Sequence, residues 1–348
     1  MSTLKVDNIR HNNATSDAIT MASDGTCTAK ITSINGGSQL SHRNLIINGA
    51  MIVAQRLPSP SVHQGEGYRT VDRFRYNVDP NPNEQPNQAQ HVLTSSDTGP
   101  YEEGFRFSYF IENGNQGTQP SNGNIEIFHR VESQNLHNSG WNYTSTSSFI
   151  TLSFWAKSSV TQTFYGRVMS ETGTSLNFPY EIDLVGGTWK KFTIKIPGHA
   201  SLGFTNTNTS GMRIEWVQAA GTDQSGSATL NQWSTYSSTD RYPAVASTWY
   251  DTDNATYEIT GVQLEVGDTA TSFEHRSYHD ELKRCRRYFC KYVGNLNINF
   301  VNEHPTNTSG YIHFPFYETM RIAPTVTVGS NVGIARPQVP VTQKVQSV

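Results

Sequence analysis

Short runs of alternating apolar and polar residues recur along this chain, and they limit it to a fold built from strands. Residues 151–157 alternate, with Leu152, Phe154 and Ala156 on one face. Successive side chains of a strand point to opposite faces, so this run predicts a strand with one buried face. Asn, Gly, Ser, Thr and Pro residues separate the runs as turn signals, and no helical period of 3.6 residues extends across them.

Further runs of this kind occur throughout residues 44–275 and predict one large body. From Trp189 to Ile196, the side chains of Phe192, Ile194 and Ile196 face one way and the intervening polar ones face the other. Several short strands with turn signals between them predict an all-β sandwich. The other predicted strands are Asn44–Gly49, Phe164–Met169, Met212–Val217 and Tyr257–Val266.

The composition fits a thin sandwich with long polar loops. Hydrophobic residues make up 35% and charged residues 16% of the chain, whereas ordinary soluble domains are about 45–50% apolar and about 25% charged. Aromatic residues are plentiful at 11%, and a few of them fill a two-sheet core. The net charge of −3 excludes a general attraction to nucleic acid or to anionic membranes. We expect neither a signal peptide nor a membrane span, because no long apolar stretch occurs.

The three cysteines are Cys27, Cys285 and Cys290, and their spacing fits no metal site. Cys285 and Cys290 lie five residues apart on a predicted helix, so they do not share a face. We therefore expect three free thiols, in a protein made in a cytosol.

Residues 1–43 form a thin leader with few apolar side chains. Short alternating runs such as Leu4–Val6 and Lys30–Thr32 are separated by turn signals. A single copy cannot bury enough apolar surface to offset its ordering entropy. Either the leader is a disordered tail, or it is a strand-rich stalk that pairs with symmetry mates. The unpaired edges of so β-prone a segment favour the stalk.

Two predicted loops are long, at residues 77–100 and 219–252, and loops of this length are usually functional or mobile. The second loop holds five large aromatic residues among Asn, Asp, Gln and Arg. Aromatic rings can stack on the apolar faces of sugars, and the polar side chains can bind the hydroxyls. The alternative is that these rings only pin the loop against the sandwich. The candidate glycan-binding residues are Trp233, Tyr236, Tyr242, Trp249 and Tyr250.

Residues 276–293 interrupt the β pattern. Leu282, Cys285, Phe289 and Tyr292 recur at helical spacing, with acidic residues first and basic residues later, so this segment predicts one amphipathic helix. Residues 294–348 predict a small C-terminal β tip, with β character in Tyr311–Phe314 and Pro324–Val328, and a tail.

Motifs at both ends of the predicted body resemble a known family. The segments Asn44–Met51, Gln55–Arg56 and Val71–Phe74 resemble the opening "N-L-L-I-N-G … Q-R … D-R-F/W" of jelly-roll domains in bacteriophage tail-fibre proteins. Ile259–Gly267 and Ala270–Arg276 are similar to the closing "T-G-V-Q-L-E-x-G-x-x-A-T-P-F-E-x-R" of the same family. These motifs lie over 200 residues apart, which makes their joint presence fairly specific.

Two further segments extend the resemblance to about three quarters of the chain. Glu281–Phe289 resembles the "E-L-x-x-C-x-R-Y" that follows in the family, and Ser2–Ile9 resembles the N-termini of fibres from phages of marine bacteria. The resemblance implies an antiparallel jelly-roll sandwich of the carbohydrate-binding type over residues 44–275 and a homotrimer. It also implies a virion appendage, attached to other tail proteins by residues 1–43, that binds a host-surface glycan or outer-membrane receptor.

The sequence predicts no enzyme. It contains no nucleophile elbow, Walker A loop, dinucleotide fingerprint or H-E-x-x-H motif. The carboxylate pairs Glu102–Glu103 and Asp251/Asp253 are expected to be solvated loop charges, although a fibre-borne polysaccharide depolymerase would need such a pair. A head-fibre, decoration or baseplate component without receptor contact is the other alternative.

No cofactor is expected, apart from the structural calcium that jelly-roll modules of this type often hold. Glu265 or Asp268 would supply its oxygen ligands, but no ordered ligand series accompanies them.

Overall fold

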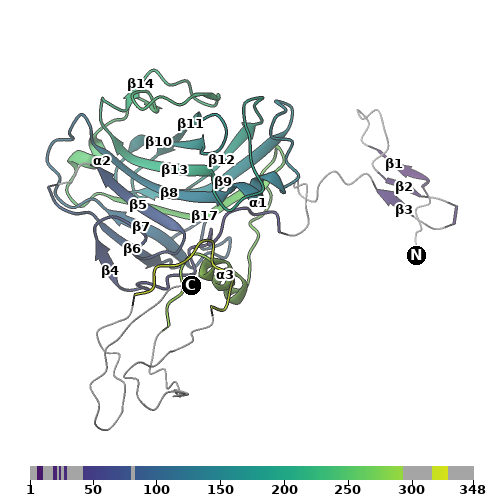
Figure 1. Cartoon of the computed structure of the whole chain (residues 1–348), viewed down its shortest axis with the longest axis horizontal. Helices are drawn as coiled ribbons and strands as arrows, with labels where there is room; N and C mark the ends of the chain where they lie inside the picture. Colours follow the sequence, from purple (N-terminus) through teal and green to yellow (C-terminus); the bar gives the residue numbers. More distant parts are fainter. Residues whose placement is uncertain are drawn as a thin grey trace, which may run out of the picture.

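The chain forms a sandwich of two six-stranded sheets, which we call sheet A and sheet B (Figure 1). Every strand pairing within these two sheets is antiparallel, which confirms the predicted all-β class and the jelly-roll sandwich. The computed structural model describes residues 6–10, 19–21, 23–24, 27–29, 42–79, 83–292 and 316–327.

The order of strands within each sheet differs from their order along the chain. Sheet A contains, in spatial order, β15 (Ser234–Thr235), β11 (Leu176–Leu184), β10 (Gln162–Ser170), β13 (Ser210–Ala220), β8 (Asn124–Glu132) and β5 (Phe74–Asp79). Sheet B contains β12 (Lys190–Pro197), β9 (Phe149–Ser158), β17 (Thr256–Val266), β7 (Phe107–Glu112), β6 (Asn87–Val92) and β4 (Val62–Gln64).

The inner faces of the two sheets form one continuous core. In β9, the predicted alternation holds, and Leu152, Phe154 and Ala156 are completely buried. The ring of Phe154 meets that of Trp216 from sheet A edge-on, with 5.6 Å between ring centroids. Burial of one such aromatic side chain contributes roughly 2–3 kcal/mol, so these rings dominate the stability of the sandwich.

Strand β6 lies inside residues 77–100, so the prediction of one long loop there was wrong. The inward side chains of β6 are Gln88 and Gln90, which are buried but amide-bearing. Gln88 accepts a hydrogen bond from the hydroxyl of Tyr109 (2.8 Å), and Gln90 donates one to the carbonyl of Met51 (2.7 Å). A strand that buries glutamines has no apolar alternation, and hydropathy therefore gave no signal for it.

The predicted strand Asn44–Gly49 is also wrong, because this segment has no strand geometry of its own. It nevertheless lies along β17: the amide of Leu45 donates to Leu264, and Gly49 accepts from the amide of Val262. The side-chain oxygen of Asn44 accepts from Leu264 N at 3.1 Å in place of a backbone group. The side chain of Asn44 thus replaces a backbone acceptor in the row of hydrogen bonds along β17.

Asn48 is the centre of a contact, which we call the clasp, between the start of the body and the final helix. It is fully buried at a positive φ of 65°. Its side-chain amide donates to the carbonyls of Val53 (2.8 Å) and Asp72 (2.9 Å) and accepts from Val53 N. Its backbone N–H donates to Glu281 Oε1 at 2.6 Å. An asparagine tolerates this left-handed backbone better than most residues.

The predicted helix forms as α3 (Tyr278–Arg286), capped by the Ser277 side chain, and it ends before residue 293. Cys285 and Leu282 pack against Ile47 and Val53, and Cys285 is a free thiol, as is Cys290. Just before the helix, Arg276 donates to the carbonyl of Ile46 at 3.0 Å and Glu274 accepts from Asn44 N at 2.9 Å. The opening and closing motifs are therefore in contact, and their shared role is structural.

The described part of the leader contains β1 (Asn8–Ile9), β2 (Ile19–Met21) and β3 (Cys27–Ala29), which form a small antiparallel sheet. Pairing of this segment with symmetry mates stays a prediction. In the C-terminal region, residues 324–327 form no strand, contrary to expectation, and the predicted strand at 311–314 lies outside the described residues. None of the helices in the described ranges has the length and apolar character needed to cross a membrane.

Gly49 approaches β17 so closely that a side chain does not fit. A Cβ atom on Gly49 would lie 2.0 Å from the carbonyl oxygen of Val262, whereas one on Gly203 would have its nearest neighbour at 3.9 Å. We expect Gly49→Ala to lower the free energy of unfolding by roughly 3 kcal/mol. Gly203→Ala is the matched control and should change it little. Equal stability of the two variants in urea denaturation would contradict the close approach.

Asp72 is buried, with only 2% of its side chain exposed. Gln55 Nε2 donates to one carboxylate oxygen at 2.5 Å, and Arg56 lies 3.3 Å from the other. Burial raises the pKa of Asp72 from 3.8 to about 6, although Gln55 and Arg56 act in the opposite direction. The folded protein therefore holds the proton of this carboxyl group to a higher pH than the unfolded chain does.

This raised pKa predicts that the clasp weakens as the pH rises. Between pH 3.8 and about 6, the folded protein retains the Asp72 proton and the unfolded chain does not. The free energy of unfolding should therefore fall through this window, by about 3 kcal/mol in total. Asp72→Asn cannot titrate, so guanidinium denaturation near pH 4 and near pH 7 should show the gap between wild type and variant shifting by most of that amount. A stability difference between wild type and variant that is the same at both pH values would refute the raised pKa of Asp72.

Candidate functional site

The outer face of sheet A carries a dense set of charged side chains. In β8, Glu126, Phe128 and Arg130 alternate with core residues and therefore point outward. In the neighbouring strand β13, Arg213 lies opposite Arg130 and Glu215 lies opposite Phe128. Cross-strand partners share a face of the sheet, so these five side chains form one surface.

Two arginines and two glutamates of this face form a buried charge network. Arg167 of β10 donates to both carboxylate oxygens of Glu215, one at 2.8 Å, and Arg213 contacts the same carboxylate. Arg213 also lies 3.8 Å from Glu126. The hydroxyl of Tyr242 donates a hydrogen bond to the carboxylate of Glu215 at 2.7 Å. The network thus attaches the segment around residue 242 to sheet A.

The two glutamates of the network have opposite pKa shifts. Burial raises the pKa of Glu126, and the charge of Glu215 raises it further. Burial would also raise the pKa of Glu215, but Arg167 and Arg213 outweigh that effect and lower it to about 2. Carboxyl pairs with separated pKa values are typical of acid–base catalysis. Here, however, Glu126 is 2% and Glu215 0% exposed, so no substrate reaches either group in this conformation.

The other carboxylate pairs of the sequence have structural partners. Glu103 accepts hydrogen bonds from Lys191 (2.8 Å) and Trp155 Nε1 (3.1 Å). Asp251 pairs with the hydroxyl of Ser247. These interactions fit the expectation that the pairs are loop charges.

The structure does not bring the five predicted aromatic residues of loop 219–252 into one platform. Tyr242 and Trp249 are fully buried and Tyr250 is 5% exposed, with Trp249 and Tyr250 of α2 (Thr248–Asp251) in the main core. Trp233 packs against Phe178, with 5.3 Å between ring centroids and the rings tilted by 57°, and donates to the carbonyl of Pro197. These four rings hold the loop in place, as the alternative interpretation has it. They were misjudged because sequence does not distinguish a buried ring in a long loop from an exposed one.

Tyr236 is partly exposed, as Trp233 is, and its ring lies beside the charged face. Its ring is 5.2 Å from the guanidinium of Arg167 and 6.0 Å from that of Arg241. Nearby, β14 (Ser225–Gly226) and β16 (Tyr242–Pro243) pair in parallel, and β14 lies above β10 and β11 in Figure 1. The loop therefore covers one half of the outer face of sheet A and leaves the other half open.

Three arginines surround Phe128 on the open half, and we call this set the arginine patch. The guanidinium carbons of Arg130, Arg213 and Arg75 lie 4.6, 5.0 and 5.6 Å from the ring centroid of Phe128. Arg75 and Arg130 each keep 33% of the side chain exposed, and Arg213 keeps 16%. Sequence analysis missed this patch, because its members come from three strands that are distant in sequence.

A cleft of about 430 Å³ continues the arginine patch toward the edge strand β5. Arg75 belongs to both features and lies 3.7 Å from Glu66. The cleft therefore offers cationic donors and carboxylate acceptors together. It is lined by Glu66, Arg75, Asn77, Val78, Asp79 and Gln85.

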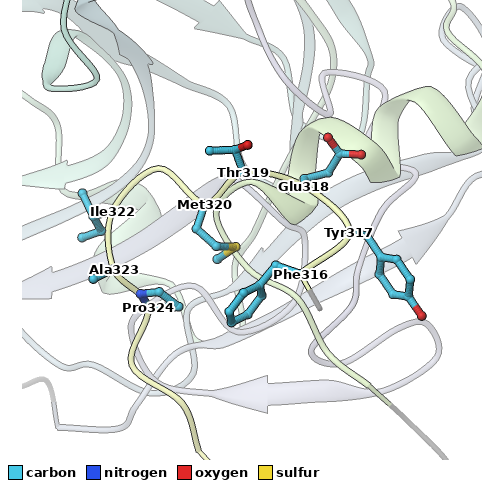
Figure 2. A pocket seen from close by; sticks show the side chains of 8 residues that line it. All are labelled: Phe316, Tyr317, Glu318, Thr319, Met320, Ile322, Ala323 and Pro324. Carbon is cyan, nitrogen blue, oxygen red and sulfur yellow. The ribbon is translucent and has the colours of Figure 1, made fainter. Parts of the chain in front are cut away.

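A second cleft, of about 580 Å³, lies in the segment next to α3 (Figure 2). Among the residues that the structure describes, its lining consists of residues 316–320 and 322–324, and few of their side chains are polar. Glu318 lies 3.9 Å from Lys283 of α3, and the backbone of Arg321 donates to Arg287. These contacts attach the segment to the helix, and this cleft brings no set of charged groups together.

The two calcium candidates do not fit a metal site. Glu265 is buried and accepts hydrogen bonds from the amide and hydroxyl of Thr271 and from Gln263, so both of its oxygens are used. Asp268 is exposed and pairs with Lys195 at 3.2 Å, which lowers the pKa of its carboxyl. Among the described residues, no three acidic, histidine or cysteine side chains are grouped as metal ligands.

No protein-family model matches the chain, and a search of curated proteins gives no match. Among solved structures, it is similar to the enzymatically active domain of bacteriophage CBA120 tailspike protein 4, at 11% identity and a TM-score of 0.32. That match covers 64% of this chain and 21% of the tailspike chain. It is also similar to a putative sugar binding protein from Bacteroides thetaiotaomicron, at 10% identity and a TM-score of 0.33, over 64% and 100% of the two chains.

A third similar structure is the family 11 carbohydrate-binding module of a Clostridium thermocellum cellulase, at 12% identity and a TM-score of 0.29. This match covers 62% of this chain and 98% of the module. At such identities and TM-scores, a likeness does not indicate what this chain binds.

Proposed function

We propose that this chain is a non-enzymatic attachment protein of a bacteriophage tail fibre, and that the open half of the outer face of sheet A binds a glycan of the host surface. The observation that carries the proposal is the arginine patch, with Arg75, Arg130 and Arg213 around Phe128 next to an open cleft.

The chemistry of this face suits a polyhydroxylated ligand. Sugar hydroxyls both donate and accept hydrogen bonds, and each guanidinium presents several donors in a fixed plane. Acceptors lie beside these donors, since Arg75 is 3.7 Å from Glu66 and Arg130 pairs with Glu171 at 2.9 Å. Charged groups of both signs on rigid strands support recognition of a neutral glycan better than that of a strongly charged one.

The assignment to a phage fibre is supported by the sequence motifs at residues 44–74 and 259–289. In the structure these motifs are structural rather than ligand-binding, which fits a scaffold shared by proteins with different receptors. We propose further that three copies assemble through residues 1–43. Three weak sites on one particle would then act together, so that avidity exceeds the affinity of one site.

A depolymerase is the second candidate function, and the separated pKa values of Glu126 and Glu215 favour it. Catalysis would require Tyr242 and its segment to move away from the two carboxylates, because both are buried beneath it.

Arg75→Ala should weaken glycan binding without unfolding the protein, because Arg75 is partly exposed and its ion pair with Glu66 is at the surface. On an array of bacterial surface polysaccharides, we expect the wild type to bind at least one polymer and Arg75→Ala to bind it at least tenfold more weakly. Arg106→Ala, an exposed arginine that stacks on Tyr101, is the matched control and should bind normally. Equal binding by wild type and Arg75→Ala, or no binding by the wild type, would refute the site. New reducing ends in the bound polymer would instead favour the depolymerase.

The trimer makes a separate prediction about particle size. Light scattering after size-exclusion chromatography should give about three chains per particle for the full chain at micromolar concentration. Deletion of residues 1–41 should give monomers with unchanged melting of the sandwich. A monomeric full chain would refute the trimer, and a labelled protein that binds the virion but no bacterial cell would favour a head-fibre or baseplate role.

A further inference from the structure

The outer face of sheet B carries an ordered row of side chains that the proposed function does not use. Cross-strand pairing places Ala89, Phe110, Glu258 and Lys157 side by side across β6, β7, β17 and β9. Partners in register share a face, so all four point away from the core. Phe110 lies in the middle of this row and is partly exposed, so its apolar ring is not part of the core.

Glu258 organises the charges beside Phe110. It is only 3% exposed, although it lies on an outer face. His91 and Ser108 hydrogen bond to one carboxylate oxygen at 3.0 and 2.5 Å, and Lys157 Nζ lies 3.0 Å from the other. Lys157 also bonds to Asp97 at 3.0 Å. The groups are thus held in fixed positions, as the binding of a small polar ligand requires.

One part of this network has a structural explanation. Asp97 belongs to the loop at residues 93–106, and it accepts hydrogen bonds from Lys157 and from Trp189 Nε1 at 2.9 Å. These bonds hold the loop against β9 and against Trp189, which directly precedes β12. They do not explain His91 or Phe110, which lie on β6 and β7, on the other side of Glu258.

The Phe110 ring is bordered by polar groups on both sides. On one side the His91 ring lies 5.4 Å away, tilted by 59°, with 49% of its side chain exposed. In the next row on the other side, Asn87 lies opposite Glu112 and donates to it at 2.9 Å. An aromatic face flanked by hydrogen-bonding side chains matches a pyranose ring, which has apolar C–H faces and a rim of hydroxyls.

We propose that Phe110 is the platform of a second saccharide subsite, which takes a neutral pyranose residue and is contacted by His91 and the Asn87–Glu112 pair. The carboxylates of Asp97, Glu112 and Glu258 lie nearby, and Lys157 pairs with two of them, so an acidic sugar is disfavoured. The subsite lies on the opposite face of the sandwich from the arginine patch. One chain can therefore bind two glycan strands, and loss of binding at one site leaves the other site unchanged.

The test uses saturation-transfer NMR with the full chain and methyl glycosides of glucose, galactose, mannose and N-acetylglucosamine. The background is Arg75→Ala, which removes the sheet A site. We expect at least one glycoside to receive saturation from this variant. Adding Phe110→Ala should remove at least nine tenths of that signal, Phe110→Tyr should keep it, and His91→Ala should weaken it severalfold.

The matched control is Tyr278→Ala, an exposed aromatic residue on α3 that should leave the signal unchanged. Melting temperatures verify that each variant is folded. Unchanged transfer in the Phe110→Ala background, or no transfer from any glycoside to the Arg75→Ala protein, would overturn the proposal. Failure of the arginine patch appears instead as unchanged polysaccharide binding by Arg75→Ala alone, so the two results are distinguishable.

Discussion

The buried amide of Asn48 is the contact on which the rest of the sandwich depends. It binds three backbone groups of the opening segment, and its own N–H reaches Glu281 of α3. A buried backbone group that loses its hydrogen-bond partner costs about 1–3 kcal/mol of stability. Loss of the Asn48 side chain would leave several such groups without partners at once. Because Asn48 joins residues that are more than 200 positions apart, it fixes how the opening segment, β17 and α3 meet. The strands of both sheets are therefore held together at the segment where the start and the end of the sandwich meet.

Each sheet has a loop fixed across one half of its outer face. On sheet A, Tyr242 and the Arg167–Glu215 pair hold the loop, whereas on sheet B the Asp97–Lys157 pair and Trp189 do so. Charged contacts of this kind fix a position more precisely than apolar burial, because their geometry is directional. The uncovered halves are therefore rigid surfaces with defined arrangements of donors and acceptors, which is what both proposed sites require.

The sequence predicted those parts of the fold in which one strand carries its own signal. β9 and β12 alternate in hydropathy, and α3 has a helical period with acidic residues first and basic residues later, so their existence followed from local pattern. β6 was missed because it buries Gln88 and Gln90 instead of apolar side chains. The two proposed sites could not be predicted from the sequence. The neighbours of Phe128 and of Phe110 are set by strand order, and strand order is a non-local property.

The position of the clasp also determines how a mechanical load would pass through the molecule. His42, Arg43 and Asn44 lie against residues 272–284, with bonds from Arg43 to the carbonyl of Ser272, from Asn44 to Glu274 and from Arg284 to His42. Tension that arrives along the backbone upstream of residue 42 is therefore transferred sideways to α3 and the segment before it. Several parallel bonds, including those from Asn44 and Leu45 to β17, would have to break together before β5 experienced that force, so the sandwich is protected from being peeled open strand by strand.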